Sequence, residues 1–132
     1  MVIADADVWI DYFERSSSRT GQALDRLIRS GRTAVAEPVL AELVRGTQGD
    51  DELQELKEML SGVPYVEMSR ETWVRAGRIA HDLDRRGTRI PVVDIFIASL
   101  AIEEGHEVFT RDRHFERIPG LRLYKPKGAS DA

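Results

Sequence analysis

The chain has 132 residues, of which 42% are hydrophobic and 32% charged, and its formal net charge is −4. This composition is typical of a folded, soluble domain and excludes a disordered chain, while the absence of cysteine excludes disulfides and thiolate metal sites. No apolar run approaches the eighteen or so residues of a membrane span, and Asp5 and Asp7 interrupt the N-terminus too early for a signal peptide. We therefore expect one domain over residues 1–132, cytoplasmic and without a membrane partner, with a loose tail from about Lys125.

Short apolar runs alternate with amphipathic segments along the chain. The first run ends at Asp5, and a short helical segment is expected over 8–14. Further helices are predicted over 20–30, from Pro38 to Gly46, over 50–60, from a Ser69 N-cap to Gly87, and over 92–104. Further strands are predicted over 33–36, 65–67, 107–110 and 121–124. This alternation predicts an α/β fold with a parallel sheet covered by helices on both sides.

Two of the predicted strands run into a carboxylate, at Asp5 and at Asp112. Each residue by itself is best explained as a turn or N-cap residue, a common position for aspartate. In open α/β sheets, however, ligands bind beyond the carboxyl ends of the strands, so a pair of acids there indicates a shared site.

Two more acids interrupt apolar helices. Asp94 lies near the start of the most hydrophobic helix, on one face with Ile97, Ala98 and Ala101, and Glu42 lies within Val39–Val44. The simpler explanation for Asp94 is that the helix dipole favours an acid in the first turn. The simpler explanation for Glu42 is the edge of an ordinary amphipathic helix. Four carboxylates from separate elements nevertheless suggest a hard cation, Mg²⁺ or Mn²⁺, which activates water and stabilises phosphoryl charge.

The basic residues and histidines give weaker evidence for a functional site. Only three of the nineteen basic residues are lysine, and arginine suits bidentate phosphate contacts. The clusters Arg85, Arg86 and Arg89, and Arg111 with Arg113, are nevertheless interpreted as solvated positions. His81, His106 and His114 have no spacing typical of zinc and are expected to lie on the surface.

Four short motifs in order resemble those of the PIN-domain ribonucleases, and most of all the VapC-type toxins of bacterial toxin–antitoxin pairs. They are Asp5–Phe13, Glu42–Leu43 with Gly46, Val93–Ala98, and Thr110–Phe115, and the resemblance extends from Val2 to about Tyr124. It implies a single PIN domain, a three-layer α/β/α fold with a small central parallel sheet, and endoribonuclease activity.

The resemblance also implies a site. Asp5, Glu42, Asp94 and Asp112 would be the catalytic acids that hold Mg²⁺ or Mn²⁺, with Glu42 acting from slightly farther away, and Thr110 would be the small hydroxyl residue beside them. Asp7 departs from the family, which more often has Asn, Ser or Thr there. It either strengthens metal binding or caps the next helix.

The implied partners are an RNA substrate, a VapB-type antitoxin and a second copy of the chain. The antitoxin's C-terminal part would lie in an apolar groove with a basic side chain near the acids. The expected groove residues are Val39, Leu40, Leu43, Leu53 and Leu56. Leu53, Leu56 and Leu60, or the helix with Trp73, would form a homodimer face if they are not core residues.

Three alternatives stay open from the sequence. Asp5-Ala6-Asp7-Val8 also resembles the first motif of haloacid-dehalogenase-like phosphatases, although no convincing lysine motif follows. Asp5, Asp7 and Lys125-Pro126 resemble parts of a phospho-accepting receiver domain, although the expected mid-chain strand ending in aspartate is missing. The third alternative is a PIN fold kept only for binding, although no acid of the quartet is lost.

Overall fold

The structure, a computed structural model, describes residues 1–127. The strands are β1 (Val2–Ala4), β2 (Thr33–Ala36), β3 (Tyr65–Val66) and β4 (Glu107–Phe109). The helices are α1 (Ala6–Glu14), α2 (Arg19–Arg29), α3 (Glu37–Arg45), α4 (Asp50–Leu60), α5 (Arg70–Arg85), α6 (Val92–Glu104) and the 3₁₀ helix η1 (Arg113–Arg117). Most of the tail expected to be loose, residues 128–132, lies outside the described residues.

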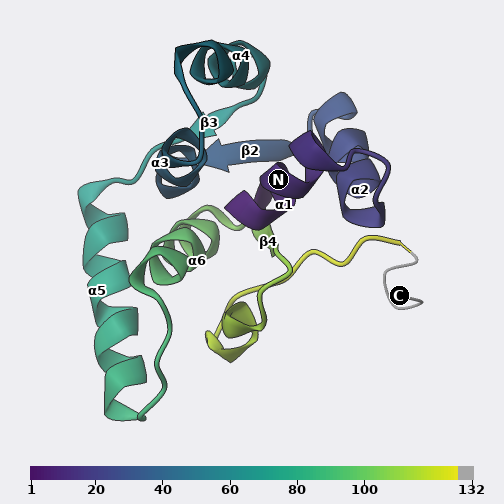
Figure 1. Ribbon diagram of the computed structural model, residues 1–132. Helices are drawn as coiled ribbons and strands as arrows, with labels where there is room; N and C mark the ends of the chain where they lie inside the picture. The colour runs from purple at the N-terminus through teal and green to yellow at the C-terminus, as the bar shows by residue number, and fades with distance from the viewer. Residues whose placement is uncertain (128–132) are drawn as a thin grey trace.

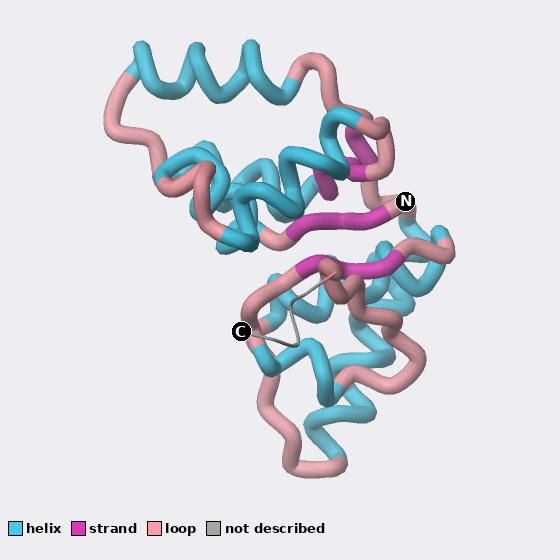
Figure 2. The backbone as a smooth tube through the Cα atoms, turned by 90° about the vertical axis from the view of Figure 1, so that its right-hand side faces the viewer, coloured by secondary structure: helices cyan, strands magenta, loops and turns pink. Residues whose placement is uncertain are grey.

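The four strands form one parallel sheet in the order β3-β2-β1-β4 (Figure 1). Val2 pairs with Thr33 on one side and with Glu107 on the other, so the first strand lies between partners from distant parts of the chain. Figure 2 shows the strands between two groups of helices. The three-layer α/β/α fold with a small parallel sheet is therefore confirmed. Within residues 1–127, no helix combines the length and the hydrophobicity that crossing a membrane requires.

The core forms where the central strands meet α6. Every residue of β1 and β2 is buried, because these strands have neighbours on both edges and helices on both faces. On α6, Asp94, Ile97, Ala98 and Ala101 are all buried, so the predicted shared face is correct. Asp94 is thus brought toward the sheet by its apolar neighbours.

The ends of the helices follow local capping chemistry. The Ser69 hydroxyl accepts a hydrogen bond from the Thr72 backbone N–H at 3.2 Å and caps α5, as predicted. Gly105, at φ +71°, ends α6 in a left-handed conformation that favours glycine. The predictions were wrong by one or two residues at α1, which begins at Ala6 because Asp5 caps it, and at α3, where Pro38 is the second residue.

Residues 121–124 do not form the predicted last strand. Only a single parallel bridge joins Leu123 to Val108, with hydrogen bonds from Val108 N–H to the Arg122 carbonyl and from Tyr124 N–H to the Val108 carbonyl. The next donor in register would be the backbone nitrogen of Pro126, which has no hydrogen. The ladder therefore ends after one bridge.

Candidate metal centre

The parallel pairing of β1 with β4 brings the two predicted strand ends together. Ala4 is in register with Phe109, so the next residues, Asp5 and Thr110, are neighbours. The Thr110 hydroxyl donates a hydrogen bond to Oδ2 of Asp5 at 3.0 Å, across 105 residues of sequence. It also accepts one from the Asp112 backbone N–H at 3.0 Å. Thr110 thus connects the ends of both strands to the acidic site.

Asp5 is a capping residue and a site residue at once. Its Oδ1 accepts a hydrogen bond from the Ala6 N–H at 2.8 Å, and its side chain is buried, with 7% of the residue exposed. Burial, followed by the charge of Asp7, raises the pKa of Asp5 to about 7. Burial therefore favours the neutral form of Asp5.

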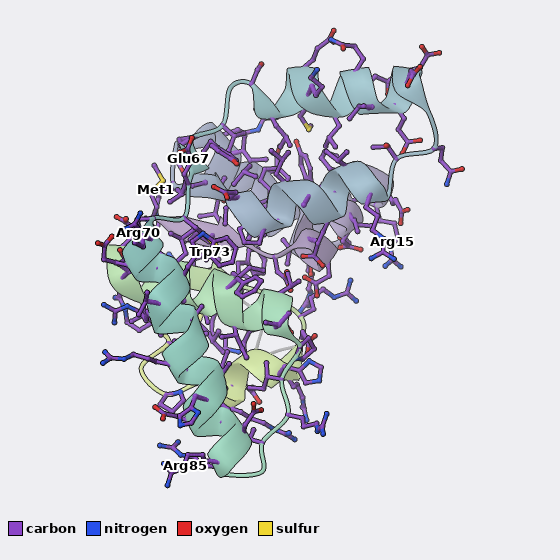
Figure 3. All side chains as sticks on the ribbon, turned by 90° about the vertical axis from the view of Figure 1, so that its left-hand side faces the viewer. Met1, Arg15, Glu67, Arg70, Trp73 and Arg85 are labelled. Carbon is purple, nitrogen blue, oxygen red and sulfur yellow. The ribbon has the colours of Figure 1, made fainter. Side chains whose placement is uncertain are left out.

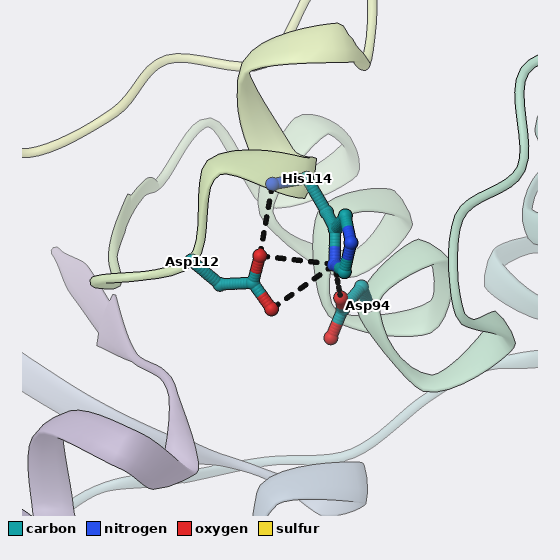
Figure 4. A group of neighbouring side chains, drawn as sticks. All are labelled: Asp94, Asp112 and His114. Carbon is teal, nitrogen blue, oxygen red and sulfur yellow. Dashed lines mark hydrogen bonds and ion pairs between the residues drawn. The ribbon is translucent and has the colours of Figure 1, made fainter.

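Asp94 and Asp112 meet at the imidazole of His114 (Figure 4). Nδ1 of His114 lies 2.9 Å from Oδ1 and 3.1 Å from Oδ2 of Asp112, and 3.5 Å from Oδ2 of Asp94. Burial and the charge of Asp112 raise the pKa of Asp94, and His114 opposes this shift. The His114 side chain is 43% exposed, so it lies at the surface as expected, but its contact with the two acids was not predicted. His81 is exposed as expected.

Asp7 lies beside this group and does not cap α1. Its Oδ2 accepts a hydrogen bond from the Arg111 backbone N–H at 3.2 Å. Its Oδ1 is buried and has no hydrogen-bond partner among the described residues. Burial raises the pKa of Asp7. A buried carboxylate oxygen without a donor is free to bind a cation or a water molecule.

A network around Asp11 holds the loop that follows β4 against α1. Asp11 is buried and accepts hydrogen bonds from Ser18 and Arg15, while Nη1 of Arg111 lies 3.5 Å from its Oδ1. The Ser18 hydroxyl, together with the arginines, lowers the pKa of Asp11, in contrast to the raised pKa values of its acidic neighbours. Arg111 is therefore half-exposed and also contacts Asp11. The interpretation of Arg111 as a solvated position did not predict this contact.

Glu42 is the exposed member of the predicted quartet. It lies on α3 and, like Asp5, is not part of the group in which Asp94, Asp112 and His114 have ligand atoms within 4.8 Å of one another. Burial of its carboxyl group and the charges of Asp94 and Asp7 raise its pKa. Its charge thus acts on the cluster from a greater distance.

Sequence and structure comparisons agree on the family. The family model described as PIN domain matches residues 2–121. The chain belongs to the PIN-domain family. This PIN domain is 28% identical to VapC ribonuclease Mb1587 of Mycobacterium bovis over 89% of this chain and 91% of the relative. It is 30% identical to ribonuclease VapC2 of Rickettsia felis over 76% of this chain and 78% of the relative, which places it among the VapC proteins.

A solved structure supports the same assignment. The PIN domain superposes on a chain of VapBC2 from Rickettsia felis, bound to a DNA fragment from their promoter, with a TM-score of 0.80 and 25% identity. The alignment covers 94% of this chain and 98% of that one. The haloacid-dehalogenase-like and receiver-domain alternatives find no support in these comparisons. The strand that a receiver domain would need to end in an aspartate, β3, ends at Val66.

Proposed function

We propose that this VapC-type PIN domain is a metal-dependent endoribonuclease and the toxin of a toxin–antitoxin pair, acting in the cytoplasm. The observation that supports this most is that Asp94 and Asp112 lie together, while Thr110 joins Asp5 to the Asp112 backbone, with raised pKa values at Asp5 and Asp94. The names of its relatives, VapC ribonucleases, supply the reaction class.

The donor set fits a divalent cation. Carboxylate oxygens are the ligands that Mg²⁺ and Mn²⁺ prefer, and the buried, unpartnered Oδ1 of Asp7 is a further oxygen without a hydrogen-bond donor. Asp5, Asp94 and Asp112 would hold the ion directly or through water, with Glu42 farther away. The bound ion supplies an activated water and stabilises negative charge on the phosphate under attack.

The chain's own residues prepare this chemistry. Thr110 fixes one oxygen of Asp5, and the α1 cap fixes the other, so that the carboxyl group cannot turn away. The Asp112 side chain is held by the His114 backbone N–H at 2.9 Å. A site assembled before substrate arrives needs little reorganisation during the reaction.

The first test is cleavage of single-stranded RNA by the purified protein. We expect cleavage with Mg²⁺ or Mn²⁺, none in excess EDTA, and recovery when the ion is returned. Circular dichroism in EDTA checks that the fold survives. Equal cleavage rates in EDTA and in Mg²⁺ would contradict the metal mechanism, and folded protein that binds RNA without cutting it would favour the binding-only alternative.

An apolar groove between α1, α3 and α4 offers a docking surface for the antitoxin. It has a volume of about 700 Å³ and is lined by Ile10, Phe13, Leu43, Leu56 and Met59. Acidic side chains of Glu14, Asp51, Glu52 and Glu55 also line it. An apolar floor with acidic edges suits an amphipathic, basic segment. Of the predicted groove residues, only Leu43 and Leu56 line it. Val39 is fully buried, Leu40 and Leu53 are not part of the lining, and α1 contributes residues that were not predicted.

Antitoxin binding should therefore depend on this groove. Met59→Glu places a charge on its apolar floor, and we expect at least a roughly tenfold loss of affinity for the antitoxin. Tyr65→Glu, at an exposed apolar residue outside the groove, is the matched control. The wild type should arrest growth when expressed alone and not with the antitoxin. Harmless overexpression of folded wild-type protein would contradict the toxin proposal.

We also propose a homodimer, as the family resemblance implies. On the predicted face of α4, Leu60 is buried, Leu56 lies in the groove with 7% exposed and Leu53 is half-buried, so this face offers little surface for pairing. Trp73 and Val74 of α5 are 44% and 58% exposed, and Trp73 packs against Phe96 of α6 (Figure 3). Sedimentation equilibrium at micromolar concentration should give twice the chain mass, and Val74→Glu should give the monomer. A monomeric wild type would remove the proposal.

A further inference from the structure

A nitrogen donor lies among the carboxylates of the site. Nδ1 of His114 is within 3.5 Å of oxygens from both Asp94 and Asp112, and Figure 4 shows the ring directed at the space between them. The ligand atoms of the three residues lie within 4.8 Å of one another, so one ion can contact all of them. The metal ligands that the family resemblance implies are the four acids, and His114 is not among them.

The spacing of these atoms suits a shared ion. Ligands about 2.1 Å from an octahedral ion lie roughly 3.0 Å from each neighbouring ligand. The Nδ1 atom of His114 is 2.9 Å from Oδ1 of Asp112 and 3.5 Å from Oδ2 of Asp94. A direct ion pair between a protonated His114 and the carboxylates would have similar distances. The two roles differ in their effect on metal binding. A histidine that is a metal ligand strengthens the binding of the ion, whereas a protonated histidine paired with the acids competes with the ion.

The local fold holds the ring in place. The His114 backbone N–H donates to Oδ1 of Asp112 at 2.9 Å, at the start of η1. The next residue, Phe115, is fully buried with 1% exposed, and it anchors η1 to the core. The backbone of His114 is therefore fixed beside the acids, and its ring contacts both of them. A ligand held in advance binds with a smaller loss of entropy.

We propose that His114 is a ligand of the ion held by Asp94 and Asp112, and that it biases the site toward first-row transition ions over Mg²⁺. The inference rests on the metal site of the proposed function. Imidazole nitrogen is a softer donor than carboxylate oxygen, and affinity for mixed nitrogen and oxygen sites rises from Mn²⁺ to Co²⁺. Mg²⁺ prefers oxygen and keeps several waters, so it gains little from this nitrogen.

The test is calorimetric binding of Co²⁺, Mn²⁺ and Mg²⁺ to the RNA-free protein. His114→Ala should weaken Co²⁺ binding by at least about tenfold, Mn²⁺ binding by less, and Mg²⁺ binding least. His114→Asn keeps a polar side chain and should show the same order. His81→Ala, at an exposed position on α5, is the control and should change none of the three. Thermal unfolding in EDTA checks the fold of each variant.

A spectroscopic measurement separates ligation from a nearby charge. Pulsed electron paramagnetic resonance of the Mn²⁺ form should show coupling to a nitrogen nucleus in the wild type and in His81→Ala, and lose it in His114→Ala. Tighter Mg²⁺ and Co²⁺ binding in His114→Ala would overturn the proposal and identify an ion-pair partner, and an equal loss for all three ions would overturn the bias toward transition ions. A wild type that binds none of the ions would instead contradict the proposed metal site.

Discussion

Replacing Asp94 by asparagine should lower the rate of RNA cleavage by at least about 1,000-fold, while the protein stays folded. The change keeps the size of the side chain and removes one negative charge from a residue that is 9% exposed at the start of α6. The loss follows because the remaining oxygens hold the ion less tightly and in a less defined position. Initial rates on a fluorescent RNA in saturating Mg²⁺ measure the effect.

A carboxylate on the neighbouring helix gives the matched control. Asp82 is exposed on α5, outside the cluster, and Asp82→Asn should cleave at the wild-type rate. If Asp94→Asn cleaves within tenfold of the wild-type rate and has an unchanged circular dichroism spectrum, Asp94 does not take part in catalysis.

The second large effect concerns stability without metal. The pKa of Asp5 is about 7 in the folded protein against an ordinary 3.8, so the folded state binds its proton more tightly than the unfolded chain does. The metal-free protein should therefore lose stability as the pH rises from about 4 to about 7, with an upper limit on the order of 4 kcal/mol above that range. Asp5→Asn removes this charge and should melt higher than wild type at pH 8 in EDTA.

Three comparisons make the stability result specific. The gain should shrink as the pH falls from 8 and vanish below the ordinary pKa of 3.8, where Asp5 of the wild type is protonated in both states. Adding Mg²⁺ should raise the melting temperature of wild type more than that of Asp5→Asn. Asp25→Asn removes a surface ion pair with Arg29 and should have little effect. If Asp5→Asn melts below wild type in EDTA at pH 8, repulsion among buried acids does not control the stability of the metal-free protein.

Much of the fold followed from local signals in the sequence. Pro91 and Gly105 enclose an apolar run, and α6 has the predicted bounds of Val92–Glu104 because proline favours a helix start and glycine a left-handed end. The prediction that Asp5 and Asp112 share a site followed from the general position of sites at strand ends. The structure joins the two residues through the Thr110 hydroxyl, which hydrogen-bonds to the Asp5 side chain and the Asp112 backbone. The strand order, with β1 between β2 and β4, depends on long-range pairing that no local pattern encodes.

The sequence was a poorer guide to those parts of the site and groove that tertiary contacts bring together. His114 has an ordinary sequence context, and only the 3₁₀ turn anchored by Phe115 brings its ring to the acids. A histidine two residues after a candidate ligand, followed by an aromatic residue, was the available signal. The contribution of Ile10 and Phe13 to the groove was hidden because α1 was expected to be only a short helical turn.

The position of β1 in the sheet has a consequence for synthesis on the ribosome. The partner of β1 on one edge, and Thr110 beside Asp5, come 105 residues after Asp5. At about 5–20 residues per second, the ribosome needs roughly 5–20 s to reach them after it has made Asp5. A growing chain that has not reached β4 contains neither Asp112 nor the strand that positions it. The acidic site therefore cannot assemble until the segment after β4 has been synthesised, long after Asp5 itself.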